Sequence, residues 1–588
     1  MNKKRLPKST YPNRYEIELD VDLDNFSYTG AQKVDLNVVE ATNNIVLNSV
    51  GIEVTKAKIQ TTKQDIPLEV NYIEEDEKIV FESQETLSEG VYELYLEFNS
   101  EITNDLKGFY KSSYMSEDGE KKWIATTQFE PTAARSAFPC WDEPEYKAIF
   151  SMTIITDEKY LRVSNEMVVE EEKVENNKLR TKFADSMKMS SYLVAFVIGD
   201  LEATVVGKSK TTDIRIIHRP GFSHQTSYAG TAAIKLLDFF EDYYKIPYPG
   251  TKLDLIAIPD FAMGAMENVG AVTFRENLLL FDKDKATRSE LDRSITVIAH
   301  ELAHMWFGDL VTMKWWDGIW LNEAFASLME VIASYNTYPE FKQWNAMNMS
   351  RTAGFSIDSL ENSRPVEFDV ETPDQAEEMF DVLTYEKGST VLRMFQMFIG
   401  EEAFQNGVEA YLNKFKFENT NSSDLWDALS EASNQPLNKI LPFWIREKGY
   451  PFLQVDCSNN FLTIKQKPFL LKNVETDKNN IKPVPVQIKF LDTGNEEKFL
   501  LDEAERVIDL KNLGEVPHIN SGGWGFFHTF YDDEVFENIL ANFDKLNDLE
   551  KYRLLEDKWM QFKKAPTDIK DFYKFLMFFK KEKDEDIW

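Results

Sequence analysis

Apolar and polar residues alternate along the first third of the chain. From about residue 12 to 203, short alternating segments such as 15–21 and 92–98 are separated by Gly, Asn, Asp and Ser. A period of two with such breaks is typical of β-strands and the turns that join them. The pattern predicts a mostly antiparallel N-terminal β domain over residues 1–203.

The period becomes helical between about residues 228 and 445. Stretches such as 231–244 and 289–308 place apolar residues three and four positions apart, with few breakers. This spacing gives an α-helix one apolar face that packs against the rest of the protein. We therefore predict an α-rich middle domain over residues 204–447.

Alternation returns after residue 452, in segments such as 461–465 and 484–490. These short strands, separated by turn residues, predict a small β domain over residues 448–530.

Helical periodicity then reappears at 532–546 and 548–562. These helices predict the start of a C-terminal helical domain over residues 531–588. The order β, α, β, α describes a multidomain α+β protein.

The chain is strongly acidic. Its 588 residues carry 100 acidic and 66 basic side chains, which give a formal charge of −34. Such a surface repels phosphate backbones and anionic lipid headgroups. We therefore expect no nucleic-acid partner and no binding to a membrane surface.

Two cysteines, Cys140 and Cys457, are too few for the disulfide framework of a small secreted domain. No apolar run approaches the roughly 18 residues that a membrane span needs, and the first residues lack the apolar segment of a signal peptide. These features predict a cytoplasmic protein without a membrane span.

A candidate metal site lies in the predicted helix 289–308. His300 and His304 are four positions apart, which corresponds to about 400° of helix, so both rings project from one face and can bind one Zn²⁺. Glu301 lies on the neighbouring part of that face, where it can reach a water on the metal. The alternative is accidental placement of two of the six histidines.

A third ligand is predicted at Glu323, 19 residues after His304 and in the first turn of a second helix. A carboxylate from a neighbouring helix would leave the fourth zinc position open, as in catalytic rather than structural sites. The alternative is a carboxylate that only stabilises the helix start. The nearby Trp315, Trp316 and Trp320 are interpreted as core residues.

Glu330 follows Glu323 by seven residues and therefore lies on the same helical face. We predict that it accepts a hydrogen bond from the outer ring nitrogen of a ligand histidine.

Four motifs, in their order along the chain, resemble those of the gluzincin aminopeptidases of the aminopeptidase N family, which includes puromycin-sensitive aminopeptidase and the tricorn-interacting factors. Residues 128–135 and 137–144 resemble the family's first-domain signature, and residues 264–268 match its exopeptidase motif Gly-Ala-Met-Glu-Asn. Residues 300–326 resemble its zinc segment. Residues 385–388 and 391–394 resemble the segment with its catalytic tyrosine.

The resemblance implies a zinc aminopeptidase with one Zn²⁺ per chain, acting on small peptides with a free N-terminus. It implies a β saddle, a thermolysin-like catalytic domain, a small β-sandwich and a helical C-terminal domain. It also implies that His300, His304 and Glu323 bind zinc, that Glu301 is the general base and that Tyr385 stabilises the oxyanion.

The family's substrate-binding residues also have counterparts here. Glu130 and Glu267 would bind the α-amino group of the substrate. The other implied substrate-binding residues are Gln128, Met263, Gly264, Ala265, Met266 and Asn268.

The chain departs from the family at Met305, Asp309, Ala324 and Val269, none of which is a ligand or an acid–base position. Family members usually continue through a longer helical domain, so we expect a truncated C-terminal domain and a more open active site.

Two alternatives stay open, a non-catalytic scaffold on the same fold and an epoxide-opening relative. Scaffolds usually lose a zinc ligand or the base, and the epoxide-opening enzymes typically have Gly where this chain has Ala265. Oligomeric state is not predicted.

Overall fold

The computed structural model describes residues 5–61, 64–472, 481–565, 569–583 and 587. The chain divides into two compact units, and the division falls inside helix α3 (Trp320–Thr337), directly after Asn322. Unit 1 comprises Met1–Asn322, Val370–Met379 and Leu412–Asn421, and unit 2 comprises Glu323–Asp369, Phe380–Tyr411 and Ser422–Trp588.

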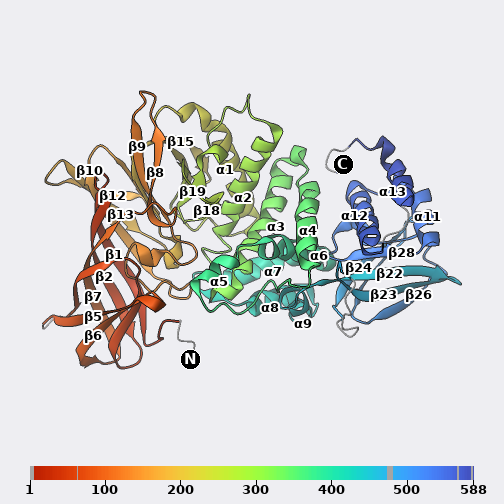
Figure 1. Ribbon diagram of the computed structural model, residues 1–588, viewed down its shortest axis with the longest axis horizontal. Coiled ribbons are helices and arrows are strands. Elements are labelled where there is room, and N and C mark those ends of the chain that lie inside the picture. The colour runs from red at the N-terminus through yellow and green to blue at the C-terminus, as the bar shows by residue number, and fades with distance from the viewer. Residues whose placement is uncertain (1–4, 62–63, 473–480, 566–568, 584–586, 588) are drawn as a thin grey trace. The chain divides into compact units, whose positions relative to one another are not determined.

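Unit 1 begins with a ten-stranded sheet, coloured red to orange in Figure 1, in the order β12-β13-β10-β1-β2-β7-β4-β5-β6-β3. Only β1 and β10 pair in parallel among its described strands, so the predicted antiparallel character is confirmed. Every second residue of the predicted strand 15–21 is buried, because one face covers the core. The strands are β1 (Thr10–Asp22), β2 (Ser27–Val38), β3 (Thr42–Asn48), β4 (Glu53–Gln60), β5 (Ile66–Ile73), β6 (Lys78–Leu87), β7 (Gly90–Glu101), β10 (Ile149–Asp157), β12 (Val168–Lys173) and β13 (Lys178–Asp185).

A second sheet has the order β11-β14-β9-β8. Its strands are β8 (Gly108–Met115), β9 (Lys121–Gln128), β11 (Leu161–Ser164) and β14 (Phe196–Gly199). Strand β9 ends at Gln128, and the chain beyond it is anchored by the fully buried Phe129, Phe138 and Trp141. Rigid packing therefore surrounds the predicted site residue Glu130, which lies in this segment.

The next part of unit 1 combines a five-stranded sheet, β15-β16-β17-β19-β18, with two long helices. In Figure 1 helices α1 and α2 lie beside this sheet. The sequence pattern did not predict strands inside the α-rich block. The elements are β15 (Glu202–Ser209), β16 (Thr212–His218), α1 (Ser227–Tyr244), β17 (Lys252–Ile258), β18 (Ala265–Met266), β19 (Ala271–Arg275) and α2 (Arg288–His304).

Short elements complete unit 1. Strand β20 (Thr312–Met313) pairs in parallel with β21 (Asn419–Thr420), and α5 (Pro373–Glu378) begins at a capping Thr372.

Helices make up the first part of unit 2, where α4 packs against the π-helical turn η8 (Leu383–Lys387) that leads into α6. The helices from α4 to α10 are α4 (Gln343–Asp358), α6 (Gly388–Ile399), α7 (Glu401–Lys414), α8 (Ser422–Ser433), α9 (Leu437–Ile440) and α10 (Pro442–Ile445). The last residues of α7 belong to unit 1.

Two small sheets follow in unit 2, in the orders β26-β23-β22-β28 and β25-β24-β27. The predicted strand 484–490 is β24 (Val484–Phe490), and 461–465 lies inside β23 (Phe461–Phe469). The other strands are β22 (Tyr450–Ser458), β25 (Glu496–Leu501), β26 (Glu505–Asp509), β27 (Pro517–Ile519) and β28 (His528–Tyr531).

The chain then forms α11 (Asp533–Ala541), α12 (Asp548–Lys564) and α13 (Ile569–Leu576). The two helices predicted at 532–546 and 548–562 are present, although α11 ends early and a 3-10 turn follows it. The 3-10 turns of both units are η1 (Glu74–Asp76), η2 (Ala134–Ser136), η3 (Ser191–Leu193), η4 (Ser223–Gln225), η5 (Glu276–Leu278), η6 (Trp316–Gly318), η7 (Pro339–Phe341), η9 (Ser521–Gly523), η10 (Phe543–Lys545) and η11 (Met577–Lys581).

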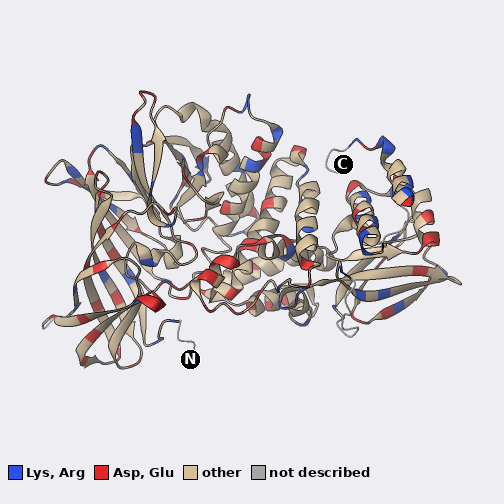
Figure 2. Cartoon of the chain, viewed as in Figure 1, with Lys and Arg blue, Asp and Glu red and all other residues tan. Residues whose placement is uncertain are grey.

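Acidic residues are spread along the chain in both units, with Lys and Arg scattered among them (Figure 2). Within the described residues, every helix is too short or too polar to cross a membrane. The four domain boundaries drawn from the sequence stay predictions, because the two units do not test them.

Candidate metal centre

Helix α2 carries the two histidines and is fixed at its beginning by a capping box. The Glu290 amide donates to Thr287 Oγ1 over 3.2 Å, and the Thr287 amide donates to Glu290 Oε2 over 2.8 Å. These two bonds satisfy amide groups that have no partner inside the helix. The second half of α2 is buried, including Ile298 and Leu302, so its last turns have little freedom to move.

His300 and His304 lie one turn apart at the end of α2. Their ring centroids are 4.8 Å apart, as expected for positions i and i+4 on one helix face. Glu301, between them in sequence, is only 5% exposed. The predicted shared face of the two imidazoles is therefore present.

The loop after α2 orients the His304 ring. Its Nδ1 lies 3.0 Å from the carbonyl oxygen of Phe307. A carbonyl only accepts hydrogen bonds, so Nδ1 carries the hydrogen and Nε2 keeps its lone pair for a metal. The next residue, Gly308, has φ +131°, and a Cβ there would lie 3.2 Å from His304 Nδ1. A glycine is therefore needed at this position.

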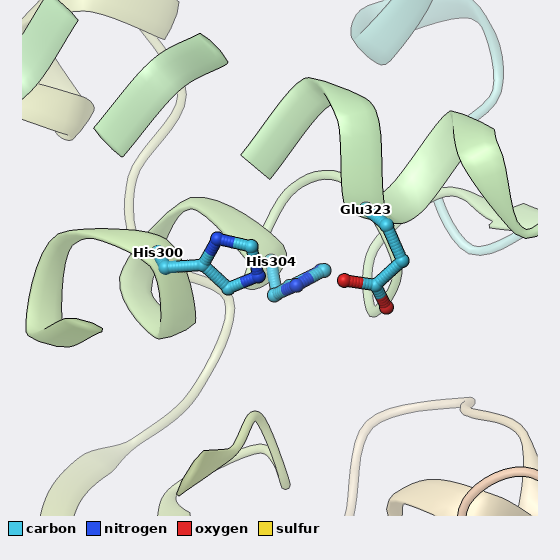
Figure 3. A group of neighbouring side chains, drawn as sticks. All are labelled: His300, His304 and Glu323. Atoms are coloured by element: carbon cyan, nitrogen blue, oxygen red, sulfur yellow. The ribbon is translucent and has the colours of Figure 1, made fainter. Parts of the chain in front are cut away.

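Glu323 lies in the first turn of α3, as predicted. One ligand atom from each of His300, His304 and Glu323 lies within 4.8 Å of the other two, and the three side chains point toward one another (Figure 3). His304 and Glu323 are almost fully buried. Two imidazoles and one carboxylate are a donor set that suits Zn²⁺, so these residues fit a metal ion.

Glu323 also belongs to a second cluster, which consists of three carboxylates. The carboxylates of Glu130, Glu267 and Glu323 have oxygens within 4.8 Å of one another. Glu267 is 3% exposed, and its Oε1 lies 3.7 Å from His304 Nδ1. Like charges this close repel one another unless a cation lies among them. The group is therefore suited to an ammonium ion or a metal ion.

The segment 264–268, which resembles the exopeptidase motif, contributes an edge strand to the five-stranded sheet. Ala265 and Met266 are β18, which pairs with β19, and the Gly264 carbonyl accepts the Arg275 amide over 2.9 Å. Gln128 contacts this edge, since its Nε2 lies 3.4 Å from the Met266 sulfur. The structure thus brings Gln128 to the motif.

Asn268 and Met263 differ in their surroundings. Asn268 is buried and donates within its own turn, to Thr273 Oγ1 at 3.3 Å and to the Ala271 carbonyl at 3.4 Å. These bonds give it a structural task in the loop. Met263 is 47% exposed, so in this structure it is a surface side chain.

Tyr385 lies in the π-helical turn η8 of unit 2 and is half-buried. Its predicted role and that of Glu330 on α3 stay predictions. Trp316 and Trp320 are buried core residues, as predicted. Trp315 is half-buried, stacks under the Arg5 guanidinium at 3.6 Å and donates to the Val370 carbonyl.

Two further buried residues lie beside the site: Lys147, which the sequence did not single out, and Asp309, which it named only as a departure from the family. Lys147 donates from Nζ to the carbonyls of Asp309 and Leu310, at 3.0 and 3.2 Å, and burial lowers its pKa to about 7. Among the described residues, neither carboxylate oxygen of Asp309 has a hydrogen-bond partner. Burial first, and then Glu267, raise the pKa of Asp309 well above its usual range.

Comparison with known proteins gives the family. Residues 228–444 match the peptidase family M1 domain, and residues 11–193 match the peptidase M1 N-terminal domain. Over 601 residues the chain is 34% identical to the alanine/arginine aminopeptidase of Saccharomyces cerevisiae, with 100% of this chain and 69% of the yeast protein covered. The chain belongs to peptidase family M1. All three matches contain parts of the site, because the M1 domain holds α2 and α3 and the N-terminal domain holds Glu130.

Other M1 relatives are longer than this chain. It is 37% identical over 569 residues to aminopeptidase M1-A of Oryza sativa, with 94% of this chain and 64% of the rice protein covered. It is 35% identical over 598 residues to puromycin-sensitive aminopeptidase of Caenorhabditis elegans, with 99% of this chain and 63% of the worm protein covered. The chain therefore spans slightly less than two thirds of these relatives.

Proposed function

We propose that this M1 family member is a zinc-dependent aminopeptidase that hydrolyses N-terminal amino acids from small peptides. The observation that carries the proposal is the convergence of His300, His304 and Glu323 within 4.8 Å, with Glu301 on the same helix as the two histidines. M1 peptidases are zinc metallopeptidases, and the relatives named above are aminopeptidases.

One zinc ion per chain would be held by His300, His304 and Glu323. When bound, zinc would polarise the scissile carbonyl and lower the pKa of water. Glu301 would take the proton from the attacking water and pass it to the departing amine, so one carboxylate acts first as base and then as acid. Its burial on α2 keeps the carboxylate in one position for both transfers.

Glu130 and Glu267 would bind the ammonium group of the substrate. Two buried or half-buried carboxylates facing one cation form charge-assisted hydrogen bonds. They would favour peptides with a free N-terminus and set the register so that only the first peptide bond reaches Glu301.

The remaining predicted substrate contacts would lie around this ammonium site. The edge strand with Gly264, Ala265 and Met266, next to Gln128, would line the first side-chain pocket. Met263 precedes this segment and Asn268 follows it. We propose both residues as more distant parts of the pocket wall.

Tyr385 would act on the carbonyl oxygen as it gains negative charge. A phenol hydroxyl donates a hydrogen bond that is stronger in the tetrahedral state than in the substrate, which lowers the barrier. Donors of this kind contribute about 3 kcal/mol in other enzymes.

The test compares chromogenic anilides of free amino acids with their N-acetylated analogues, on the full chain with and without a chelator. We expect turnover of the free amines only, loss of turnover with phenanthroline and recovery on adding zinc. No turnover by the zinc-loaded protein would instead favour the scaffold alternative, and opening of an epoxide substrate would favour the hydrolase alternative. The cytoplasmic location stays a prediction that cell fractionation can test.

A further inference from the structure

The turn that carries Tyr385 is an unusual piece of helix. Residues Leu383–Lys387 form a π-helix between Val382 and the start of α6 at Gly388. The π-helix is rare, occurs mostly as a single turn and is frequent at functional sites. Such a turn needs contacts from outside to hold it.

At its beginning the turn is held by Asp381. Oδ1 of Asp381 accepts the amides of Leu383 at 2.9 Å and Thr384 at 3.1 Å. The Arg364 guanidinium donates to the same oxygen over 2.6 Å and to Thr384 Oγ1 over 3.3 Å. The amides that the turn leaves without internal partners are thus satisfied by one half-exposed carboxylate.

At its end the turn is held by a buried ion pair. Lys387 Nζ lies 2.8 Å from Asp358 Oδ2, and both side chains are 0% exposed. The other Asp358 oxygen accepts from Ser363 Oγ at 2.7 Å and from the Gly449 amide at 2.8 Å. Lys387 also donates to the Glu447 carbonyl at 3.4 Å. The carboxylate is therefore fixed by two further segments of unit 2.

The same turn abuts the start of α3. A Cβ at Gly388 would lie 2.6 Å from the Cβ of Ala324, the residue that directly follows Glu323. The missing side chain at Gly388 allows this close approach. Within unit 2, a small shift of the turn would therefore change where Tyr385 lies relative to the first turn of α3.

We propose that the Lys387–Asp358 ion pair is a positioning device that sets the place of the Tyr385 hydroxyl. This inference rests on the proposed function and on the role of Tyr385 in it. Apolar residues of the same volume would stabilise a buried site as well as an ion pair does or better, so the pair is better explained by the fixed geometry that it imposes. Lys387 is two residues from Tyr385, so its anchoring restricts the tyrosine directly.

The test is a double-mutant cycle on the full chain. Lys387→Met with Asp358→Asn removes both charges together, while Asn Oδ1 can still accept from Ser363 and Gly449. This paired variant is combined with Tyr385→Phe, and kcat and KM are measured on an alanine anilide. We expect the paired variant to lower kcat about 10-fold or more with KM within about twofold, and Tyr385→Phe to lower kcat about 100-fold.

The cycle separates positioning from general stability. If the pair acts through Tyr385, adding it to Tyr385→Phe lowers kcat by less than about twofold. Equal losses in both backgrounds would overturn the inference, as would an unchanged kcat in the paired variant. Lys252→Met with Asp254→Asn is the matched control, because these residues form a buried ion pair at 2.7 Å in unit 1. We expect this control to change kcat by the same factor in the wild-type and the Tyr385→Phe backgrounds.

Should the paired variant not fold, Lys387→Gln with Asp358→Asn replaces it, because two amides remove both charges and can still hydrogen-bond each other, and the same pattern is expected. A wild-type chain without turnover would contradict the proposed function itself. A wild-type chain with turnover and an equally active Tyr385→Phe would overturn the inference alone.

Discussion

His304 Nδ1 and the Phe307 carbonyl oxygen are 3.0 Å apart, so the loop that follows α2 orients a predicted metal ligand through the main chain. This backbone carbonyl accepts the Nδ1 hydrogen of His304 and so helps to fix the orientation of the ring. If Glu330 supports a ligand histidine, as predicted, we expect that histidine to be His300.

Replacing Glu330 with Ala should weaken zinc binding about 10- to 100-fold, because outer partners of ligand histidines orient the ring and raise its basicity. Competition with a chelator measures the affinity. Glu340→Ala, at an exposed carboxylate beyond the same helix, is the control and should leave the affinity unchanged. An affinity equal to that of the wild type in Glu330→Ala would remove this role.

Replacing Glu301 with Gln should lower kcat about 100- to 10,000-fold while zinc stays bound, because the amide cannot accept the proton from water. Turnover of an alanine anilide and elemental analysis of the same sample measure both quantities. Glu290→Gln, at the other end of α2, should lower the melting temperature slightly and keep kcat. Retained activity in Glu301→Gln would contradict the assignment of the base.

Replacing Glu267 with Ala should weaken the binding of free-amine peptides about 10- to 100-fold, since a charge-assisted hydrogen bond to the ammonium is lost. Free and N-acetylated peptides are compared as competitive inhibitors. Glu276→Ala removes a half-buried carboxylate that pairs with Arg219 and should affect neither inhibitor. An equal loss for both peptides in Glu267→Ala would argue against ammonium recognition.

Lys147 should make the stability of the fold depend on pH. Its pKa is about 7 in the folded chain and about 10.4 when unfolded, so between these values the unfolded chain binds more protons and stability rises with pH. The slope is about 1.4 kcal/mol per pH unit for one group. Lys147→Met lacks this titration, so its melting temperature relative to wild type should be higher near pH 7 than near pH 9.5.

Thermal melts of both proteins at the two pH values check this difference. Lys33→Met, at an exposed lysine, should show the same offset at both. An offset for Lys147→Met that does not change with pH would show that this amine is charged in the folded chain.

The sequence placed the candidate metal ligands on helices that the structure contains, but it predicted the end of α2 four residues too late. Met305, Trp306 and Phe307 are buried, so the apolar pattern continues through them. The main chain nevertheless turns there, since the amides of Trp306 and Phe307 both bond the Ala303 carbonyl. Hydrophobic periodicity reports burial, whereas the end of a helix is set by hydrogen bonds.

Three other features of the structure could not be predicted from the hydrophobic pattern of the sequence. Strand β17 is buried at every position, so it shows no alternation and resembles a short piece of buried helix. The π-helical turn around Tyr385 ends at Lys387, which forms an ion pair with Asp358, a residue 27 positions before Tyr385. Lys147 was not distinguishable from the other lysines, because its burial depends on tertiary packing.

Gly308 limits how this protein can be re-engineered. Its positive φ would strain any other residue type, and a Cβ at this position would lie 3.2 Å from His304 Nδ1, so the ring would have to shift by a few tenths of an ångström. A library that randomises the loop after the candidate metal ligands should therefore be enriched in glycine at this codon among its active clones, and diversity is better sought at neighbouring positions.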